Sequence, residues 1–329
     1  MVKTHKSSSS TLQNILFRKA EDLNLSVALP PEEAYIGSPE NFNRRFILGD
    51  DGKRLYNIMA SHMKFETWKG NDIQEVMAPD AKYISVLRNP ATQYESMYTY
   101  YAWKSTRYMV ELSTFLKTPE KYMTIYEPEK PYVAGRNPMT FDNGLDARKL
   151  EEGDPRVDKF ITELDQRHHL VLIAEYFDES LILLKDLMCW TIYDVIHFTM
   201  NSRSRESLVE TSSIDEDAIL KWNWADVKLY SHFNKILWEK IANYGEKKMA
   251  SEVAHLREMK KNLTKECIGT TINNGDKRVW YPQGIKINSY IVNTHARRKH
   301  LCGQLTRPEH GYLNLLRERV LSVNQLTSG

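Results

Sequence analysis

A run of hydroxyl side chains at the start of the chain most limits what the chain can fold into. Lys6 is followed directly by four serines and a threonine, residues 7–11. Leu12, Ile15 and Leu16 then recur at the spacing of an amphipathic helix. The run therefore predicts a loop that opens a helix, where backbone N–H groups, a partial positive charge and short hydroxyls bind phosphate.

The order of residues in this loop excludes a common class of phosphate site. A Walker-type loop places a lysine after a glycine-rich turn that wraps a nucleoside triphosphate. Here the lysine precedes the hydroxyls, and the first glycine of the chain is Gly37. The loop is therefore expected to hold a different phosphate ester.

A second candidate phosphate contact lies about eighty residues further on. Tyr83 to Leu87 read as a buried strand, Arg88 ends it, and Pro90 suits the first turn of the next helix. Arg88 and Ser96 would then point at one group, and a guanidinium fork can donate two parallel hydrogen bonds to a phosphate. Taken alone, Arg88 fits a surface ion pair and Ser96 an ordinary helix residue.

Strands and helices alternate through the first half. The predicted strands are Arg45 to Leu48, Tyr56 to Ser61, Tyr83 to Leu87 and His169 to Ala174, and the predicted helices are Thr11 to Ala20, Asp72 to Met77, Ala91 to Trp103 and Val157 to Arg167. This order indicates an α/β fold with a parallel sheet between helices. Ligand then belongs at the carboxyl ends of the strands, where Lys6 and Arg88 both fall.

The second half reads as mostly helical. We expect one domain, with residues 1–178 as the nucleotide-binding α/β portion and residues 179–329 as a helical portion packed on it. Glu127 to Pro155, with four prolines and three glycines, predicts a long irregular loop. Trp222, Trp224 and Trp238 are expected in the core.

Charge and apolar content exclude other classes of protein. Lys and Arg total 45 against 43 for Asp and Glu, a formal net charge of +2, which is no polycation for nucleic acid. No stretch of about twenty apolar residues is present, so the chain as given is expected to be soluble. Three cysteines at this spacing fit no zinc site, and no metal is expected.

Several ordered segments resemble one enzyme family, the galactose 3-O-sulfotransferases. The segments are Lys3-Thr4-His5-Lys6 with its hydroxyl run, His62-Met63-Lys64-Phe65, Leu87-Arg88-Asn89-Pro90 with Ser96, Arg136 to Asp142, Glu175 to Leu187 with Cys189-Trp190, and Leu229 to Asn234. The resemblance runs from residue 2 to about residue 320.

The resemblance implies a P-loop-like sulfotransferase fold and sulfuryl transfer from 3′-phosphoadenosine 5′-phosphosulfate (PAPS) to the 3-hydroxyl of a β-galactose. A galactosylceramide-type glycolipid is the expected acceptor, and a glycoprotein glycan stays open. The implied donor-binding residues are Lys3, Lys6, Ser7, Ser8, Ser9, Ser10, Thr11, Arg88 and Ser96. Members of the family are type II membrane proteins of the Golgi lumen. We therefore expect a membrane anchor, a stem and a first core strand to be missing here, and the missing strand would have formed an edge of the sheet.

The acceptor hydroxyl needs a base, because it keeps its proton at neutral pH. His62 at a predicted strand end is the first candidate, and His5 beside Lys6 is the second, since an imidazole titrates near neutrality. Lys6 is expected at the transferred group. Glu175 and Asp178 are candidates for holding galactose or acting as base, although Asp178 or Ser180 could simply cap a helix. Arg136 and Asp142 lie in family-like segments and are further candidates for a substrate contact, whereas Lys185 lies in such a segment without a legible role.

The cysteines and two sequons fit passage through an oxidising compartment. Cys189 is expected to be a buried free thiol, whereas Cys267 and Cys302 could form a disulfide. Asn24-Leu25-Ser26 and Asn262-Leu263-Thr264 are glycosylation sequons. Two alternatives remain open: a sulfotransferase acting on another sugar position, and a relative that binds nucleotide or glycan without turnover.

Overall fold

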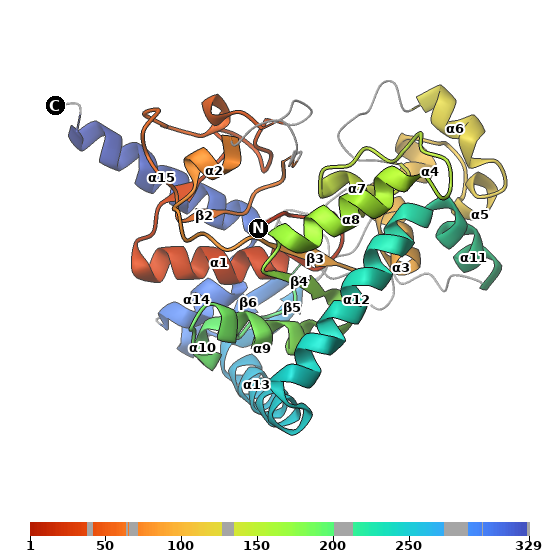
Figure 1. Ribbon diagram of the computed structural model, residues 1–329. Coiled ribbons are helices and arrows are strands. Elements are labelled where there is room, and N and C mark those ends of the chain that lie inside the picture. The colour runs from red at the N-terminus through yellow and green to blue at the C-terminus, as the bar shows by residue number, and fades with distance from the viewer. Residues whose placement is uncertain are drawn as a thin grey trace.

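The chain folds into a mixed α/β structure that is mostly helical (Figure 1). The structure is a computed structural model, and it describes residues 1–329 except 38–41, 64, 66–71, 127–134, 201–212, 273–288, 298 and 328–329. None of the helices within these ranges is long and apolar enough to cross a membrane.

The strands are short, and the helices are most extensive in the second half. The strands are β1 (Val27–Ala28), β2 (Ile58–Met59), β3 (Ile84–Leu87), β4 (Leu170–Ile173), β5 (Ile268–Ile272) and β6 (Ser289–Val292). The helices are α1 (Ser9–Leu23), α2 (Asp72–Val76), α3 (Pro90–Tyr100), α4 (Trp103–Thr106), α5 (Leu112–Phe115), α6 (Pro119–Tyr126), α7 (Pro138–Asp142), α8 (Pro155–Arg167), α9 (Phe177–Leu187), α10 (Ile192–Val195), α11 (Ser213–Trp222), α12 (Trp224–Tyr244), α13 (Glu246–Cys267), α14 (His300–Thr306) and α15 (Glu309–Thr327).

Two parallel strand pairs are joined by the N-terminal residues. β1 pairs with β2, and β3 pairs with β4. The amino group of Met1 donates to the carbonyl of Met59 at 2.8 Å, and the N–H of Val2 donates to the carbonyl of Ile84 at 2.8 Å. The N-terminus therefore lies near the middle of the molecule (Figure 1).

Burial explains the composition of the central strands. All four residues of β3 and of β4 are buried, as expected for parallel strands covered on both faces. α9 and α12 pack against β4, and α1 packs against β2. The cluster that contains Leu12, Val86 and Leu172 is the main core.

The predicted parallel strands and their helices are confirmed, but the strands are shorter than expected and form two separate two-stranded pairs. The four predicted helices correspond to α1, α2, α3 and α8, and three predicted strands correspond to β2, β3 and β4. The predicted strand from Arg45 to Leu48 is wrong, because Arg44–Phe46 form a 3₁₀ helix. The side chain of Asn43 accepts a hydrogen bond from the N–H of Arg45 and so stabilises the turn.

Other corrections fall in the second half. β5 and β6 form an antiparallel pair that sequence reasoning missed. Trp222 and Trp224 are buried as predicted. Trp238 is 45% exposed and contacts Tyr176 in a T-shaped arrangement, so its predicted place in the core is wrong. Cys189 is exposed because it follows the end of α9 in a left-handed conformation, at φ 52°.

The segment from Glu127 to Pro155 is more ordered than predicted. Residues 127–134 lie outside the described residues, but Pro138–Asp142 form α7, a short buried helix. This helix carries a carboxylate into the candidate site described below.

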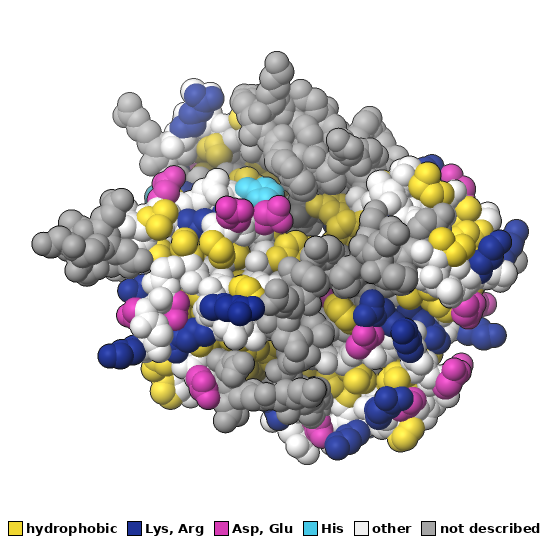
Figure 2. All heavy atoms as spheres, turned by 90° about the horizontal axis from the view of Figure 1, so that it is seen from above, with side chains coloured by type: hydrophobic (Ala, Val, Ile, Leu, Met, Phe, Trp, Pro, Cys, Tyr) yellow, Lys and Arg dark blue, Asp and Glu magenta, His cyan; other side chains and the backbone are white. Residues whose placement is uncertain are grey.

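Charges of both signs are interspersed on the face of the molecule shown in Figure 2. Figure 2 shows Lys or Arg side chains beside Asp or Glu side chains on the face that it presents, with apolar side chains scattered between them. This distribution agrees with a near-neutral net charge, and any excess of positive charge must be local.

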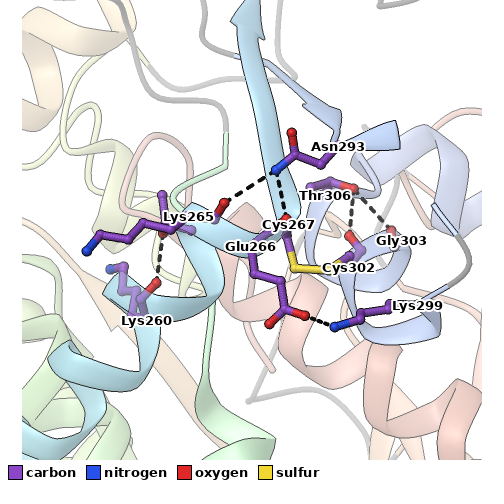
Figure 3. Close-up of a disulfide and its surroundings, with 10 residues drawn as sticks. Lys260, Lys265, Glu266, Cys267, Asn293, Lys299, Cys302, Gly303 and Thr306 are labelled. Carbon is purple, nitrogen blue, oxygen red and sulfur yellow. Dashed lines mark hydrogen bonds and ion pairs between the residues drawn. A yellow bond between two sulfur atoms is a disulfide. The ribbon is translucent and has the colours of Figure 1, made fainter. Parts of the chain in front are cut away.

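A disulfide joins the end of α13 to α14 (Figure 3). Cys267 and Cys302 are 35 residues apart in sequence, and both are buried. Beside them Asn293 donates to the carbonyls of Lys265 and Glu266, and the hydroxyl of Thr306 donates to the carbonyl of Cys302. The expected pairing is confirmed, and it fixes the helix that leads into the turn between α14 and α15.

Removing the disulfide should lower the free energy of unfolding. In the loop-entropy description, a closed loop of this length contributes about 4 kcal/mol. Urea unfolding of the double variant Cys267→Ala, Cys302→Ala should show a loss of about this size. Cys189→Ala is the matched control, since Cys189 is an exposed free thiol, and should unfold like the wild type. Equal free energies of unfolding for the double variant and the wild type would show that the disulfide does not stabilise the fold.

Candidate functional site

Several distant parts of the chain line a cavity of about 1200 Å³, among them the segment of Tyr35, His62 after β2, and Glu175 after β4. Its wall also includes the first loop and α1, the end of β3 with α3, and the turn between α14 and α15. The residues that carry the argument are His5, Lys6, Ser7, Ser8, Ser9, Ser10, Tyr35, His62, Arg88, Ser96, Tyr100, Glu175, Glu309 and His310. Carboxyl ends of parallel strands and a helix N-terminus thus meet at one cavity, as expected from the sequence.

The first loop is a tight turn that leads directly into α1. Lys6 and Ser8 both take left-handed conformations, at φ 55° and 68°, and α1 begins at Ser9. The hydroxyl of Ser9 donates to the carbonyl of Thr4 at 2.6 Å, and the hydroxyl of Thr4 donates to the carbonyl of Val86. The loop is therefore pinned to β3 from inside, and residues 5–10 face the cavity.

Arg88 and Ser96 lie in the same cavity as the loop. Arg88 Nη1 donates to the carbonyl of Lys6 at 3.2 Å, and its Nε donates to the hydroxyl of Thr92 at 3.1 Å. Ser96 is buried in the cavity wall on α3. Asn89 caps that helix, and Pro90 occupies its first turn as predicted.

Two of the predicted donor-binding residues do not line the cavity. Lys3 is buried, and its ammonium pairs with Glu309 Oε1 at 2.5 Å. The hydroxyl of Thr11 is also buried and accepts a hydrogen bond from the N–H of Met200 at 3.0 Å. Both side chains support the loop from behind, so a direct contact with a nucleotide stays a prediction for them.

Asp142 holds both the backbone and the ring of His5. Its Oδ2 accepts hydrogen bonds from the N–H of His5 at 2.7 Å and from His5 Nδ1–H at 2.8 Å. Both residues are about nine-tenths or more buried. Because Nδ1 carries the proton toward the carboxylate, Nε2 is the ring nitrogen with a lone pair. Asp142 thus orients an imidazole, which differs from the substrate contact that sequence reasoning considered.

α7, which carries Asp142, is itself capped by a buried carboxylate. Asp226 on α12 accepts hydrogen bonds from the N–H groups of Met139 and Thr140, at 3.0 and 2.7 Å, and from the hydroxyl of Thr140 at 2.7 Å. Burial raises the pKa of Asp226 to about 7 against the lowering effect of these bonds. The sequence gave no signal for this contact, because it joins residues about ninety positions apart.

His62 lies beside His5 with its own fixed orientation. Its Nδ1–H donates to the carbonyl of Lys3 at 3.1 Å, so its Nε2 carries the lone pair. The two imidazole rings stack with centroids 4.3 Å apart and planes inclined by 18°. Burial and the positive charge of Lys3 lower the pKa of His62 well below its ordinary value, so this ring stays neutral at neutral pH.

The remaining predicted acceptor contacts are distributed differently. Glu175 lines the cavity, but its carboxylate accepts from the N–H of Asn89 at 2.9 Å and from the hydroxyl of Tyr230 at 3.3 Å. Asp178 pairs with Arg257 at 2.7 Å. Arg136 stacks on Trp222 and donates to backbone carbonyls. Asp178 and Arg136 lie outside the cavity wall.

Three cavity residues were missed by sequence reasoning. Glu309 begins α15 and reaches back to Lys3 and to the hydroxyl of Ser10, at 3.5 Å. The ammonium of Lys6 lies over the ring of Tyr100, 3.6 Å from the ring centroid, in a cation–π contact. Tyr35 contacts both histidines. Tyr100 lies four residues after Ser96 on the same face of α3, and this spacing was a signal for it. Tyr35 and Glu309 stand in segments without a motif.

Comparisons with known proteins agree on one family. The family model described as galactose-3-O-sulfotransferase matches residues 1–320. Galactosylceramide sulfotransferase of Mus musculus is 36% identical, over 95% of this chain and 76% of its own. Galactose-3-O-sulfotransferase 2 of Homo sapiens is 38% identical, over 81% and 67%, and galactose-3-O-sulfotransferase 3 of Mus musculus is 33% identical, over 96% and 76%. No solved structure shows a significant match.

The lowered pKa of His62 gives a direct spectroscopic prediction. In ¹H–¹⁵N spectra of the imidazole groups, the His62 signals should stay at neutral-ring positions from about pH 8 to about pH 6, with the proton on Nδ1. The His62→Gln variant assigns these signals, and the exposed His255 serves as internal reference. A His62 titration midpoint at or above the ordinary histidine value would contradict the burial argument.

Proposed function

Because the chain belongs to the galactose-3-O-sulfotransferase family, we propose that it transfers the sulfuryl group of PAPS to the 3-hydroxyl of a terminal β-galactose. The observation that carries this proposal is the meeting of two kinds of group in one cavity. A hydroxyl-rich loop with Lys6 and Arg88 lines the same cavity as the stacked imidazoles of His5 and His62.

The residues present fit the donor. Residues 7–10 lie at the N-terminus of α1, where N–H groups and hydroxyls suit the 5′-phosphate. Arg88 before α3 and Ser96 on the second turn of α3 suit the 3′-phosphate, since a guanidinium binds phosphate through parallel hydrogen bonds. PAPS supplies the sulfuryl group. Lys6 is the cation that would stabilise charge growing on the leaving phosphate oxygen, and no metal is required for this role.

The imidazoles suit proton transfer from the acceptor. We assign His62 as the base, because its Nδ1–H is held by the carbonyl of Lys3 and its neutral Nε2 would take the proton of the sugar hydroxyl. The competing assignment is His5, whose ring is oriented by Asp142 in the manner of a carboxylate–histidine pair. Because the rings stack closely, a positive charge on His5 disfavours protonation of His62.

The proposed acceptor is a galactosylceramide-type glycolipid, as the name of one group of relatives suggests. The relatives named as galactose-3-O-sulfotransferases 2 and 3 keep a glycoprotein glycan open as the runner-up. The proposed place of action is the Golgi lumen. The disulfide suits an oxidising compartment, and both sequon asparagines, Asn24 and Asn262, are exposed.

The test of the activity is transfer of labelled sulfate from PAPS to galactosylceramide, lactose and Galβ1-3GalNAc, followed by linkage analysis of the product. We expect sulfate on the 3-hydroxyl of galactose. Sulfate on another position would support the alternative sugar specificity. Tight nucleotide binding without transfer to any of the three would support a relative that binds without turnover.

Arg88→Ala should weaken binding of adenosine 3′,5′-bisphosphate. A charge-assisted contact to a phosphate is lost, and we expect a cost of about 2 kcal/mol in calorimetry. Ser96→Ala should cost less. Arg156→Ala is the matched control, because Arg156 pairs with Asp154 outside the cavity and should leave affinity unchanged. Equal affinities of Arg88→Ala and the wild type would remove the 3′-phosphate assignment.

His62→Ala should lose turnover while it keeps nucleotide affinity. Removal of a general base costs about 10²–10⁴ in rate, and the nucleotide contacts lie on other residues. The measurement is kcat with a galactoside acceptor beside calorimetry with adenosine 3′,5′-bisphosphate, and His255→Ala is the control. If His62→Ala turns over normally and His5→Ala is inactive, the base is His5. Should both variants stay active, Glu175 becomes the candidate.

A further inference from the structure

Lys3 and Lys6 belong to one loop, but their ammonium groups have different partners. The ammonium of Lys3 is buried and pairs with the carboxylate of Glu309 at 2.5 Å. The ammonium of Lys6 lies 3.6 Å from the centroid of the Tyr100 ring, and both residues line the cavity. The proposed function gives Lys6 a role and leaves Tyr100, which contacts its ammonium, without one.

An aromatic ring binds a cation differently from a carboxylate. The face of the ring attracts the cation through its quadrupole but carries no formal charge. Burial, with a smaller contribution from the charge of Glu309, raises the pKa of Tyr100 to about 12, so the phenol is neutral at neutral pH. The ring therefore holds the ammonium of Lys6 without cancelling its positive charge, which an ion pair with a carboxylate would do.

The backbone near this contact is fixed, but the backbone alone does not place the ammonium. Lys6 has a left-handed conformation, at φ 55°, and its carbonyl accepts a hydrogen bond from Arg88 Nη1 at 3.2 Å. The carbonyl of His5 accepts a hydrogen bond from Gln93 Nε2 of α3 at 2.8 Å. A lysine side chain has a long flexible stem, so its charged end needs a contact of its own. Tyr100, the last residue of α3, provides one.

The contact lies on the side of the cavity that contains the imidazoles. Tyr101, the residue after Tyr100, meets the ring of His5 edge-on, with centroids 6.3 Å apart. Tyr35, whose ring stacks on His62, interacts electrostatically with Tyr100. A sulfuryl group that passes from a phosphate at the loop to an acceptor beside the imidazoles must cross this region. An ammonium held there suits the stabilisation of charge on the leaving oxygen.

We propose that Tyr100 is a positioning residue for sulfuryl transfer: its ring holds the ammonium of Lys6 in the cavity, where the leaving oxygen of the donor develops its charge. In the transfer, the sulfur–oxygen bond to the donor phosphate breaks and its electron pair stays on the phosphate oxygen. The acceptor oxygen bonds to sulfur, and its proton passes to the base. The inference rests on the proposed function and adds a residue that acts through Lys6.

The test separates the ring of Tyr100 from its hydroxyl. With saturating PAPS and a galactoside acceptor, Tyr100→Leu should lower kcat about tenfold or more, because the aromatic face is lost. Its affinity for adenosine 3′,5′-bisphosphate in calorimetry should stay within about threefold of the wild type. Tyr100→Phe keeps the face and should keep kcat within about threefold.

Tyr244→Leu is the matched control. The ammonium of Lys248 lies 4.0 Å from the centroid of the Tyr244 ring, and neither residue lines the cavity. This variant loses a contact of the same kind at a distance from the site, so its kcat should equal that of the wild type. An equal fall in kcat for Tyr244→Leu and Tyr100→Leu would show a general effect on the fold, and the inference would be wrong.

An NMR measurement follows the contact without turnover. An aromatic ring shields protons that lie over its face, so the ε-methylene signal of Lys6 should lie upfield of the other lysine signals in the wild type and in Tyr100→Phe. The spectra are ¹H–¹³C correlations of protein labelled on lysine, and Lys6→Ala assigns the signal. In Tyr100→Leu the signal should move to the position of exposed lysines.

The outcomes distinguish the inference from the proposed function. An unshifted Lys6 signal in the wild type overturns the inference, and so does a Tyr100→Leu variant with the kcat of the wild type, even if sulfate transfer is confirmed. A Tyr100→Leu variant that loses nucleotide affinity and melting temperature together with kcat has lost structure, and the inference is then wrong. If the wild type transfers no sulfate, the proposed function fails, and the Lys6 signal alone decides whether Tyr100 positions the ammonium.

Discussion

The two hydrogen bonds from His5 to Asp142 are the contact on which the arrangement of the site depends. They tie a loop at the start of the chain to α7, a helix of five residues from its middle. A helix this short has little stability of its own, so its position is set by tertiary contacts. Asp226 supplies three of them by accepting bonds at its N-terminal end. The place of one imidazole in the cavity thus rests on two buried carboxylates, each of which would be costly to leave without its donors.

Local patterns in the sequence predicted those parts of the site that local chemistry determines. The hydroxyl run before a helical repeat predicted the loop and α1, and a buried strand before Asn89 and Pro90 predicted β3 and α3. Each signal lies within a few residues of the structure that it specifies. For that reason the sequence alone predicted Lys6, Arg88, Ser96 and both histidines as site residues, and all of them line the cavity.

The features that were missed are made by contacts between distant residues. Glu309 meets Lys3 across about three hundred positions, and Asp226 meets α7 across about ninety, so no spacing rule reveals either contact. The predicted strand at Arg45 failed because Asn43 offers its side chain to the backbone and stabilises a turn instead. Cys189 was expected to be buried because its helix is apolar, but the chain has already left the helix at that point. Tertiary contacts decided the first two cases, and local backbone geometry decided the last two.

The hydrogen bond from Arg88 to the carbonyl of Lys6 has a consequence for ligand recognition. If Arg88 holds one phosphate of the donor and the Lys6 loop holds the other, the two subsites share a mechanical link. A ligand that orders Arg88 then also restricts the loop, and the entropy of ordering is lost once for both phosphates. A nucleotide with a single phosphate lacks one of the two contacts. The remaining contact alone must then offset the entropy lost when both Arg88 and the loop become ordered. The loss of binding free energy on removing both phosphates would then differ from the sum of the two separate losses. Tight binding would therefore require both phosphates together.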